Sequence, residues 1–587
     1  MSLVAGSGTR VAVGGIAVPP LADPLATPYA EIDTAVAEVA ARRVAWQGLS
    51  VAGRIALLDR LIADTAAVSH RWVEVERERK RIERGSQLLG EEWFLGPWIA
   101  LRGLRLLRVT LQEIERHGRP RLPGPVRCGG DGRVLARVFP TDVYDRLFFT
   151  GFNADVWMPS GVSVEEVQAT IGAPYRAGAP RRSRVGVVLG AGNVSAIPFV
   201  DVICKMFVED QVVVLKLNPI TNSIGVVFGE ALRALIDGGY VRIVRGGVEE
   251  GQYLVHHDSV EAVHMTGSDK TYDAIVFGTG EDASARRAQN RPVLVKPITA
   301  ELGNVTPVIV VPGDWSRAAF DFHARLIAMM LTHGASNECV NARLLVTPAG
   351  WSGREQLLAA LRRVLRRVAN RVAFYPGVEE RLALFRAAHP EAELLGAGPP
   401  GSLPWALITG VDPRSDDIVF TSDPFAPVLA ETALEASSVA EYIDRAVAFC
   451  NERVWGTLGV SLIVRPRSLK DPGTAAAVRR ALADLRYGTI AVNGTPAYAF
   501  AFQSSPWGAF PGHTASDIQS GRGFVHNTYL LGQAEKTVIR SPFRTFPEPA
   551  YFPTHHRADE VCRGVASLEA QPGPAKLPAI FWNAIRG

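Results

Sequence analysis

The chain has 587 residues, too many for one hydrophobic core, so its length predicts two or three domains. Hydrophobic residues make up 47% and charged residues 21%, which is typical of a globular protein and excludes long disorder and fibrous architectures. The formal net charge of +4 gives no reason to expect nucleic acid or an anionic membrane as a partner.

The sequence has no pattern typical of export or membrane insertion. The first twenty residues lack the continuous apolar stretch of a signal peptide, and no uninterrupted apolar run of about 18 residues occurs. Five widely spaced cysteines suit reduced thiols better than a disulfide framework, and no Cys/His cluster has metal-ligand spacing. We therefore expect a cytoplasmic protein with no metal site, no membrane partner and no nucleic-acid partner.

The N-terminal region is predicted to change from an extended arm to helices. Residues 1–30 are rich in Gly, Pro and Ala without a sustained period, and helical periodicity begins at about residue 31. Apolar residues then recur at three- and four-residue spacings, as one buried helix face requires: Ile55, Leu58, Leu61 and Ile62. The charge run 74–84 is interpreted as a solvated helix face that ends at Gly85.

Residues 118–183 are irregular and rich in Pro, Gly and aromatics, so we expect a bridging or oligomerisation segment there. Short apolar strands alternate with helical lengths in the rest of the chain, which indicates parallel α/β organisation. The predicted strands are 184–189, 212–216, 241–244, 262–265, 306–311, 342–347 and 460–464.

The fold class predicted from this pattern is α/β, with two parallel-sheet domains and a bridging segment. The expected boundaries follow the strands and the composition changes. They give an arm at 1–30, a first domain at 31–300, a second domain at 301–495, and a C-terminal segment at 496–587 that ends in a tail.

A glycine-rich turn at 190–195 follows the predicted strand 184–189. Its sequence, Gly-Ala-Gly-Asn-Val-Ser, nearly matches a dinucleotide fingerprint, but Ser195 replaces the third glycine. Such a turn alone is equally well explained as a tight strand-to-helix connection.

Several short motifs in the correct order make the chain resemble the aldehyde dehydrogenase superfamily. In the central part these are the strand leading to Asn193, Val213–Lys216, Thr266–Ser268, Glu301–Gly303, and Cys339 with Ala342 and Arg343 behind it. Outside it, further segments resemble family motifs: Trp46 and Arg54, Asp423–Val428, Trp455–Gly459, Val492–Asn493 and Ser505–Gly508. The resemblance covers roughly 31–540, with 118–183 poorly matched.

The resemblance implies that 31–300 is a Rossmann-like cofactor-binding domain, that 301–495 is the catalytic domain, and that 496–587 returns to the cofactor or oligomerisation region. It also implies a homo-oligomer and NAD(P)-dependent oxidation of an aldehyde to a carboxylic acid. The chemistry requires a nucleophile, because a thiolate that adds to the carbonyl makes an alkoxide able to expel hydride and leave a thioester. Cys339 is the candidate nucleophile, in a polar loop that suits a reactive thiol, whereas Cys204 in an apolar run is interpreted as a core residue.

Two further catalytic roles follow from the resemblance. The Asn193 amide and the Cys339 backbone N–H are expected to hold the oxyanion, and Glu301 is expected to activate the water that hydrolyses the thioester. Six residues are expected to contact NAD or NADP: Lys216, Gly267, Ser268, Leu302, Asp423 and Phe425. Pro219 stands where the family commonly has an acid that shares the ribose hydroxyls, so both cofactors remain open.

Departures around Cys339 keep two alternatives open. Residues 336–339 read Ser-Asn-Glu-Cys, Arg343 is one residue closer to the cysteine than in the family, and Asn304 replaces a glycine. One alternative is a CoA-acylating dehydrogenase or acyl-CoA reductase of the same superfamily, with CoA as a further partner. The other is a catalytically inactive scaffold.

The residues around the substrate can be assigned only in outline. Five aromatics are candidates for the aldehyde pocket: Phe148, Phe149, Trp157, Phe502 and Trp507. The histidines, His264 and His333 among them, are interpreted as packing or surface residues.

Overall fold

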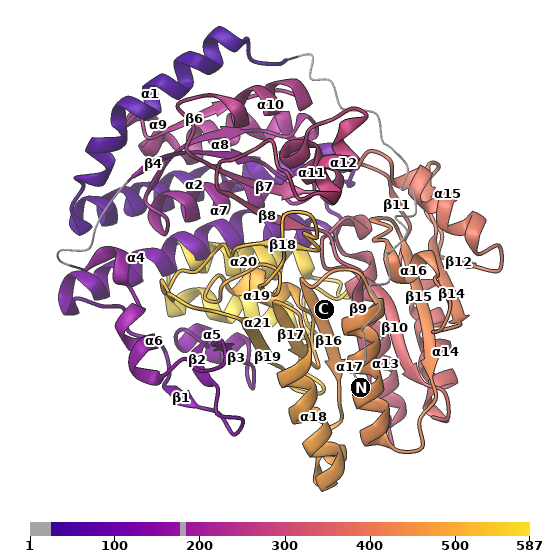
Figure 1. Cartoon of the computed structure of the whole chain (residues 1–587). Coiled ribbons are helices and arrows are strands. Elements are labelled where there is room, and N and C mark those ends of the chain that lie inside the picture. Colours follow the sequence, from indigo (N-terminus) through magenta and orange to yellow (C-terminus); the bar gives the residue numbers. More distant parts are fainter. Residues whose placement is uncertain (1–24, 177–182) are drawn as a thin grey trace, which may run out of the picture.

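A computed structural model describes residues 25–176 and 183–587, so most of the arm predicted for residues 1–30 lies outside the described residues. Two large sheets organise the chain, one with six strands and one with eleven, and β11 (Arg371–Val372) and β13 (Ser402–Leu403) form a small third sheet. Helices cover the faces of both large sheets (Figure 1). This arrangement confirms the predicted α/β class.

Long helices from the N-terminal part pack beside the six-stranded sheet: α1 (Tyr29–Gln47), α2 (Val51–Arg79), α3 (Leu89–Trp93), the π-helical turn η1 (Phe94–Trp98) and α4 (Ile99–His117). The side chain of Ser50 caps α2 by accepting a hydrogen bond from Gly53 N at 3.1 Å. The predicted apolar face of α2 is buried in the core, which confirms that prediction.

The interpretation of residues 74–84 as a solvated helix face was wrong in part, although Glu78 and Arg84 are exposed. α2 ends at Arg79, six residues before Gly85, and Glu76 and Lys80 are buried. These charges are tolerated in the interior because they are paired: Arg79 bonds Glu76, and Lys80 Nζ lies 2.8 Å from a carboxylate oxygen of Glu92. Sequence periodicity could not show these partners, since Glu92 lies on the next helix.

The six-stranded sheet has the order β18-β8-β7-β4-β5-β6 and is parallel except at β18. Its strands are β4 (Arg184–Leu189), β5 (Gln211–Lys216), β6 (Val241–Val244), β7 (Ala262–Gly267), β8 (Ile298–Leu302) and β18 (Gly521–Arg522). The connecting helices are α7 (Ala196–Phe207), η3 (Pro219–Ile224), α8 (Gly225–Ala231), α9 (Arg233–Asp237), α10 (Val248–His256), α11 (Asp269–Phe277) and α12 (Asp282–Ala288).

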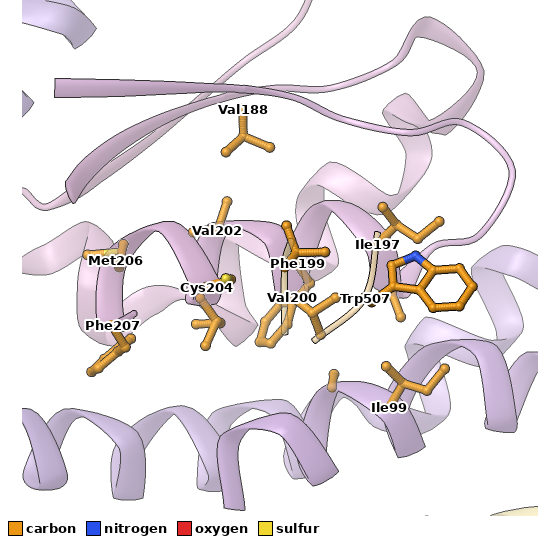
Figure 2. Packing of buried hydrophobic residues seen from close by; sticks show 14 of the residues in the cluster. Ile99, Val188, Ile197, Phe199, Val200, Val202, Cys204, Met206, Phe207 and Trp507 are labelled. Carbon is orange, nitrogen blue, oxygen red and sulfur yellow. The ribbon is translucent and has the colours of Figure 1, made fainter. Parts of the chain in front are cut away.

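Helix α7 is buried along its whole length, because α4 covers it on the side away from the sheet. Figure 2 shows its apolar side chains between Val188 of β4 and Ile99 of α4. Cys204 lies within this layer, and burial raises the pKa of its thiol to about 12. The interpretation of Cys204 as a core residue is confirmed.

The eleven-stranded sheet has the order β1-β2-β3-β19-β17-β16-β9-β10-β15-β14-β12. Its strands from β19 to β14 are parallel: β9 (Thr306–Val310), β10 (Ala342–Pro348), β14 (Trp405–Val411), β15 (Val428–Leu434), β16 (Gly459–Ile463), β17 (Thr489–Val492) and β19 (Lys536–Arg540). The edge strand β12 (Glu393–Leu395) is antiparallel to its neighbour. After β8 the chain passes from the six-stranded to the eleven-stranded sheet, and it returns to the smaller sheet at β18.

Helices pack on both faces of this sheet, and a separate apolar core fills each face. They are α13 (Arg317–Thr332), α14 (Gly353–Leu365), α15 (Val378–Ala388), α16 (Ile418–Thr421), α17 (Val439–Arg453), α18 (Pro472–Asp484) and α19 (Ala497–Phe502). Short 3-10 turns join some of them: η4 (His333–Ser336) and η5 (Pro466–Lys470).

The prediction that residues 118–183 are irregular was wrong for their middle part. Three antiparallel strands, β1 (Val126–Cys128), β2 (Val134–Phe139) and β3 (Asn153–Trp157), extend the eleven-stranded sheet. β3 pairs with β19, almost 400 residues later in the chain, as the register Lys536↔Trp157 shows. Short helical elements complete the region: α5 (Val143–Phe148), α6 (Val164–Thr170) and η2 (Ala173–Tyr175).

The chain ends in two helices, α20 (Ala558–Ala570) and α21 (Leu577–Ile585), joined by η6 (Pro574–Lys576). They return to the centre of the molecule (Figure 1), where α20 packs against α3, η1 and α4. Across the described ranges, no helix is long and apolar enough to cross a membrane.

Candidate active site

The carboxyl edge of the six-stranded sheet collects most of the predicted site residues. Lys216 ends β5, Gly267 ends β7, and Leu302 ends β8, while Asn193 follows β4. The pairing of β7 with β8 sets Gly267 beside Leu302. The strand order reverses between β4 and β7, and ligands of open α/β sheets bind in the crevice at such a point.

The thiol of Cys339 and the carboxylate of Glu301 are in direct contact. Cys339 lies in the loop between η4 and β10, and its Sγ donates a hydrogen bond to Glu301 Oε1 over 3.1 Å. Glu301 is 3% exposed, near the end of β8. Glu301 belongs to a strand of the six-stranded sheet, and Cys339 precedes a strand of the eleven-stranded sheet. The fold therefore brings together two residues that are 38 positions apart in the sequence.

Electrostatics define the resting protonation of this pair. Burial raises the pKa of Glu301 to about 7, with the negative charge of Asp201 acting in the same direction. Burial, and then the charge of Glu301, raise the pKa of Cys339 well above its usual range. Both shifts oppose charge at this position: they favour the neutral thiol and make Glu301 a stronger base than an ordinary carboxylate.

Asn193 lies beside the cysteine loop. Its side-chain Nδ2 donates to the backbone carbonyl of Asn337, two residues before Cys339, at 2.9 Å. A primary amide has two hydrogens, so one remains that can be directed at an oxygen on a carbon bonded to Cys339. The adjacent Val194 lines the same pocket as Cys339, as described below.

The loop before Cys339 is held in a strained conformation. Gly334, Ala335 and Ser336 have φ values of 58°, 54° and 66°, in the left-handed region that non-glycine residues rarely adopt. The buried guanidinium of Arg343 fixes this loop: Nη1 donates to Ser336 Oγ at 2.7 Å and Nη2 to Ser336 O at 2.8 Å. The loop geometry is thus determined by an arginine that follows the cysteine by four residues.

The same arginine connects the cysteine loop to the segment that contains Asp423 and Phe425. Arg343 Nε donates to Asp423 Oδ1 at 3.0 Å, and Asp423 Oδ1 also accepts from the backbone N–H of Phe425 at 2.8 Å. Asn337 Nδ2 donates to the carbonyl of Phe425 at 2.8 Å. Asp423 therefore supports the loop through Arg343, and its expected contact with the cofactor stays a prediction.

The carboxylate of Glu338, next to the thiol, is paired on its other side. His333 Nδ1 lies 2.8 Å from Glu338 Oε1. Burial opposes a charge on the imidazole, but Glu338 and Glu91 outweigh it and raise the pKa of His333 to about 9. The interpretation of His333 as a packing or surface residue was therefore incomplete, because it is a buried cation beside the cysteine loop.

The start of α11 suits a phosphate group. Ser268 caps this nine-residue helix by accepting from Thr271 N at 3.1 Å, and Gly267 and Ser268 are both exposed. Helix N-termini attract anions through unpaired N–H groups and the helix dipole. A Cβ on Gly267 would contact only the flexible end of Met265, so a ligand can approach its backbone closely. These residues fit the pyrophosphate of a dinucleotide.

An apolar pocket leads to Cys339. Side chains from five parts of the chain line it: Phe94, Leu95, Val194, Ile197, Met329, Met330, His333, Glu338, Cys339, Val340, Asn341, Thr495, Ala497, Tyr498, Phe500, Ala501, Trp507 and Tyr551. Its walls include η1, α7, α13 and α19 together with the C-terminal segment. No group of three or more metal-ligating side chains occurs within 25–176 and 183–587.

Of the five aromatics proposed for the pocket, only Trp507 lines it. Phe148 stacks on Phe581 at a centroid distance of 5.3 Å, and Phe149 packs edge-on against Phe502 at 5.2 Å. Trp157 is buried in β3. The sequence analysis missed four aromatics that line the pocket: Phe94, Tyr498, Phe500 and Tyr551. Phe500 is two residues from the incorrect candidate Phe502, whereas Phe94 and Tyr551 had no motif to mark them.

Comparisons with known proteins agree with this geometry. Residues 181–365 match the sequence model of the Aldehyde dehydrogenase family. The solved NAD-dependent aldehyde dehydrogenase of Sinorhizobium meliloti has a TM-score of 0.56 at 19% identity, covering 92% of this chain and 94% of that one. A glyceraldehyde-3-phosphate dehydrogenase of Methanocaldococcus jannaschii, solved with NADP, has a TM-score of 0.56 at 14% identity, covering 88% and 95%. The fold is that of the aldehyde dehydrogenases.

Two curated relatives are similar over a shorter stretch. N-succinylglutamate 5-semialdehyde dehydrogenase 1 of Caulobacter vibrioides is 31% identical over 160 residues, 27% of this chain and 30% of that protein. The N-succinylglutamate 5-semialdehyde dehydrogenase of Novosphingobium aromaticivorans is 29% identical over 151 residues, 25% and 28%. The matched stretch thus spans less than a third of each relative. The sequence match to the Aldehyde dehydrogenase family is thus confined to residues 181–365, while the fold of those enzymes extends over most of the chain.

Proposed function

We propose that the protein oxidises an aldehyde to a carboxylic acid through a thioester on Cys339, with NAD or NADP as the electron acceptor. The observation that carries this proposal is the 3.1 Å contact between Cys339 Sγ and Glu301 Oε1 beside an apolar pocket. A nucleophile and a base within hydrogen-bond reach are what acyl chemistry at a thiol needs.

In the first step, Cys339 Sγ bonds to the aldehyde carbon while its proton passes to Glu301. A pKa of about 7 makes Glu301 a much stronger base than an ordinary carboxylate, so it can accept this proton near neutral pH. The carbonyl oxygen becomes an alkoxide next to Asn193. Its free amide hydrogen stabilises that charge, a contribution of about 2.7–4 kcal/mol for oxyanion donors in general.

The alkoxide then collapses to a thioester, and two electrons leave the carbon with its hydrogen. An oxidised nicotinamide, when bound, accepts them. The residues that would hold the dinucleotide are those at the carboxyl edge of the six-stranded sheet: Lys216, Gly267, Ser268 and Leu302, with Phe425 on the opposite loop. Pro219 adds no carboxylate there, so a ribose phosphate would not be repelled and the ribose hydroxyls would lack that acceptor; both NAD and NADP therefore stay open.

The thioester is finally hydrolysed. Glu301, once it has released its proton to solvent, takes a proton from water, the hydroxide adds to the thioester carbon, and the Cys339 thiolate leaves and is reprotonated. The buried carboxylate beside the sulfur favours hydrolysis over transfer to CoA, which needs no such base. The intact pair also favours catalysis over an inactive scaffold.

The test is turnover of an aldehyde panel with NAD and with NADP, each with and without CoA, followed at 340 nm. We expect NAD(P)H formation that does not depend on CoA, and a carboxylic acid as product. In Cys339→Ala, activity should fall at least about 10³-fold because the nucleophile is lost. Cys128→Ala is the matched control, since this thiol is exposed on β1, and should be unchanged.

Two results would contradict the proposal. Turnover that requires CoA and yields an acyl-CoA would establish the CoA-acylating alternative. An absence of turnover on every aldehyde, together with no faster alkylation of Cys339 than of a buried thiol, would favour the inactive scaffold.

A further inference from the structure

The C-terminal segment 541–587 packs against the part of the molecule that forms the aldehyde pocket. Glu569 of α20 is buried and bonds two arginines of α4: Arg102 Nη1 at 2.7 Å and Arg105 Nε at 2.6 Å. A Cβ on Gly90 of α3 would lie 2.7 Å from the backbone of Ala558, so α20 and α3 are in close backbone contact. The segment is therefore an integral part of the core.

This packing brings one residue of the segment into the pocket. Tyr551 is the only lining residue that follows β19, and its hydroxyl contacts the hydroxyl of Tyr498, a second lining residue. Neighbours on both sides hold it in place. Arg325 of α13 pairs with Glu548 at 3.1 Å, and Phe552 packs against Phe322 of α13 at a ring distance of 5.3 Å.

The chemistry of the lining selects an apolar ligand. Most lining side chains are aliphatic or aromatic, and none of those named above is Arg or Lys. His333 is the one cationic side chain in the lining, and its Nδ1 lies 2.8 Å from Glu338 Oε1. The negative charge of Glu91 also acts on this imidazole, so two carboxylates compensate its single positive charge. A carboxylate on the substrate would be desolvated there without a free counter-ion, which is strongly unfavourable.

We propose that Tyr551 forms the wall that sets the depth of the aldehyde pocket, and that the substrate is an uncharged aldehyde with an apolar chain. The inference rests on the proposed function, because it takes Cys339 as the reacting end of the pocket. It separates this protein from the curated relatives named above, whose names specify a semialdehyde that carries carboxylates. The phenol ring of Tyr551, braced by Tyr498, limits the length of chain that the pocket accepts.

Removal of the ring should lengthen the pocket. Hydrophobic pockets distinguish ligands by about 10-fold or more for each methylene that fits or fails to fit. In Tyr551→Ala we therefore expect kcat/KM for long-chain aldehydes to rise about 10-fold relative to that for short-chain ones. Tyr551→Leu should give a smaller shift in the same direction, and Tyr551→Phe should keep the wild-type profile, because the ring is retained.

The first measurement is kcat/KM over linear aldehydes from propanal to dodecanal, with succinic semialdehyde as the charged member. Phe546→Ala is the matched control, since it removes an aromatic ring from the same segment at a residue that is 90% exposed and outside the pocket. It should keep the wild-type profile. An unchanged chain-length profile in both Tyr551→Ala and Tyr551→Leu would overturn the wall, and a preference for succinic semialdehyde would overturn the apolar substrate.

The second measurement does not need turnover. Cys339 is labelled with N-alkylmaleimides of increasing chain length, and labelling of its peptide is followed by mass spectrometry. Wild-type protein should discriminate against long chains, and Tyr551→Ala should lose that discrimination. If Tyr551→Ala changes the chain-length dependence of labelling while no aldehyde is oxidised, the role of Tyr551 as the pocket wall is supported and the proposed function fails. If aldehydes are oxidised but the Tyr551 variants change neither chain-length profile, the role of Tyr551 fails and the proposed function stands.

Discussion

The two halves of the site are built in different ways. The carboxyl edge of the six-stranded sheet is made from consecutive strand ends, so that its residues lie next to one another by strand pairing, as Gly267 and Leu302 do. The aldehyde pocket is made from helices and loops that are hundreds of residues apart, Phe94 and Tyr551 among them. Strand register therefore positions the first half, and tertiary packing positions the second.

Cys339 and Glu301 belong to the junction of these halves. Glu301 lies on a strand of the six-stranded sheet, and Cys339 precedes a strand of the eleven-stranded sheet. This division predicts three separate kinetic effects. Variants at the sheet edge should change KM for the cofactor, and variants in the pocket wall should change KM for the aldehyde. Variants at the junction should change the rates of the chemical steps.

The largest effect is expected at the junction, for Glu301→Gln. Removal of a general base slows each step that uses it by about 10²–10⁴-fold, and Glu301 is proposed to accept protons in both thiol addition and thioester hydrolysis. The first turnover should therefore be slowed as well as later ones, so that NAD(P)H forms slowly from the start and without a rapid burst. Stopped-flow absorbance at 340 nm follows the first turnover and the steady state.

The pH profile distinguishes this role from a structural one. The pKa of Glu301 is raised to about 7, so its basic form is present above that pH and is lost as pH falls through 7. Wild-type hydrolysis should therefore weaken below about pH 7, and this limb should disappear in Glu301→Gln. A variant that keeps both the rate and the acidic limb would remove Glu301 from the mechanism.

The next effect concerns the pocket wall, for Glu569→Gln. Arg102 keeps the carboxylate of Asp145 and Arg105 that of Asp142, so the variant loses only the charged hydrogen bonds to Glu569, and the free energy of unfolding should fall by about 1.5–3 kcal/mol. KM for the aldehyde should rise more than KM for the cofactor, because α20 braces the pocket. Chemical denaturation and steady-state kinetics check the two statements.

Glu560→Gln is the matched control on the same helix. Glu560 pairs with Arg557 at 2.8 Å, but both side chains are partly exposed, 23% and 41%. Exposed pairs contribute less than about 1 kcal/mol, so this variant should be close to wild type in stability. Equal losses in the two variants would show that the buried cluster has no special importance.

The sequence predicts these two halves unequally, for a physical reason. Lys216, Gly267, Glu301 and Cys339 stand in short motifs, because a strand end or a tight turn is encoded by a few adjacent residues. Tyr551 and Phe94 have no such local signal. Their role arises when α20 packs on α3 and α4, and the buried Glu569 that fixes this packing is, in sequence, an ordinary acid in a tail.

The same distinction explains the errors in the fold. Alternating strands and helices were recognisable wherever the chain forms consecutive α/β units. The strands β1 to β3 were not, because they are short and pair with β19, which comes almost 400 residues later. The charges of 74–84 have a helical period, which predicts a solvated face, whereas the buried Lys80 pairs with Glu92 of the next helix.

A smaller effect is expected for Asn193→Ala, also at the junction. Loss of an oxyanion donor should lower kcat by about 10²–10³-fold. The rate at which iodoacetamide alkylates Cys339 should remain near wild type, because alkylation forms no oxyanion. A parallel fall in both rates would instead indicate that Asn193 acts by positioning the cysteine loop through Asn337 O.

The smallest effect is expected at the sheet edge, for Ser268→Ala. Loss of an N-cap costs about 1 kcal/mol, and it loosens the first turn of α11, where the pyrophosphate is proposed to bind. KM for the cofactor should rise a few-fold while KM for the aldehyde stays constant, which is the reverse of Glu569→Gln. Ser50→Ala is the control, because it removes the same type of cap from α2. Arg79, which donates to Gly192 O in the glycine-rich turn after β4, lies at the opposite end of this 29-residue helix. If both serine variants change KM for the cofactor equally, general helix stability and not the start of α11 controls binding, and the division between the two halves of the site would lose its support.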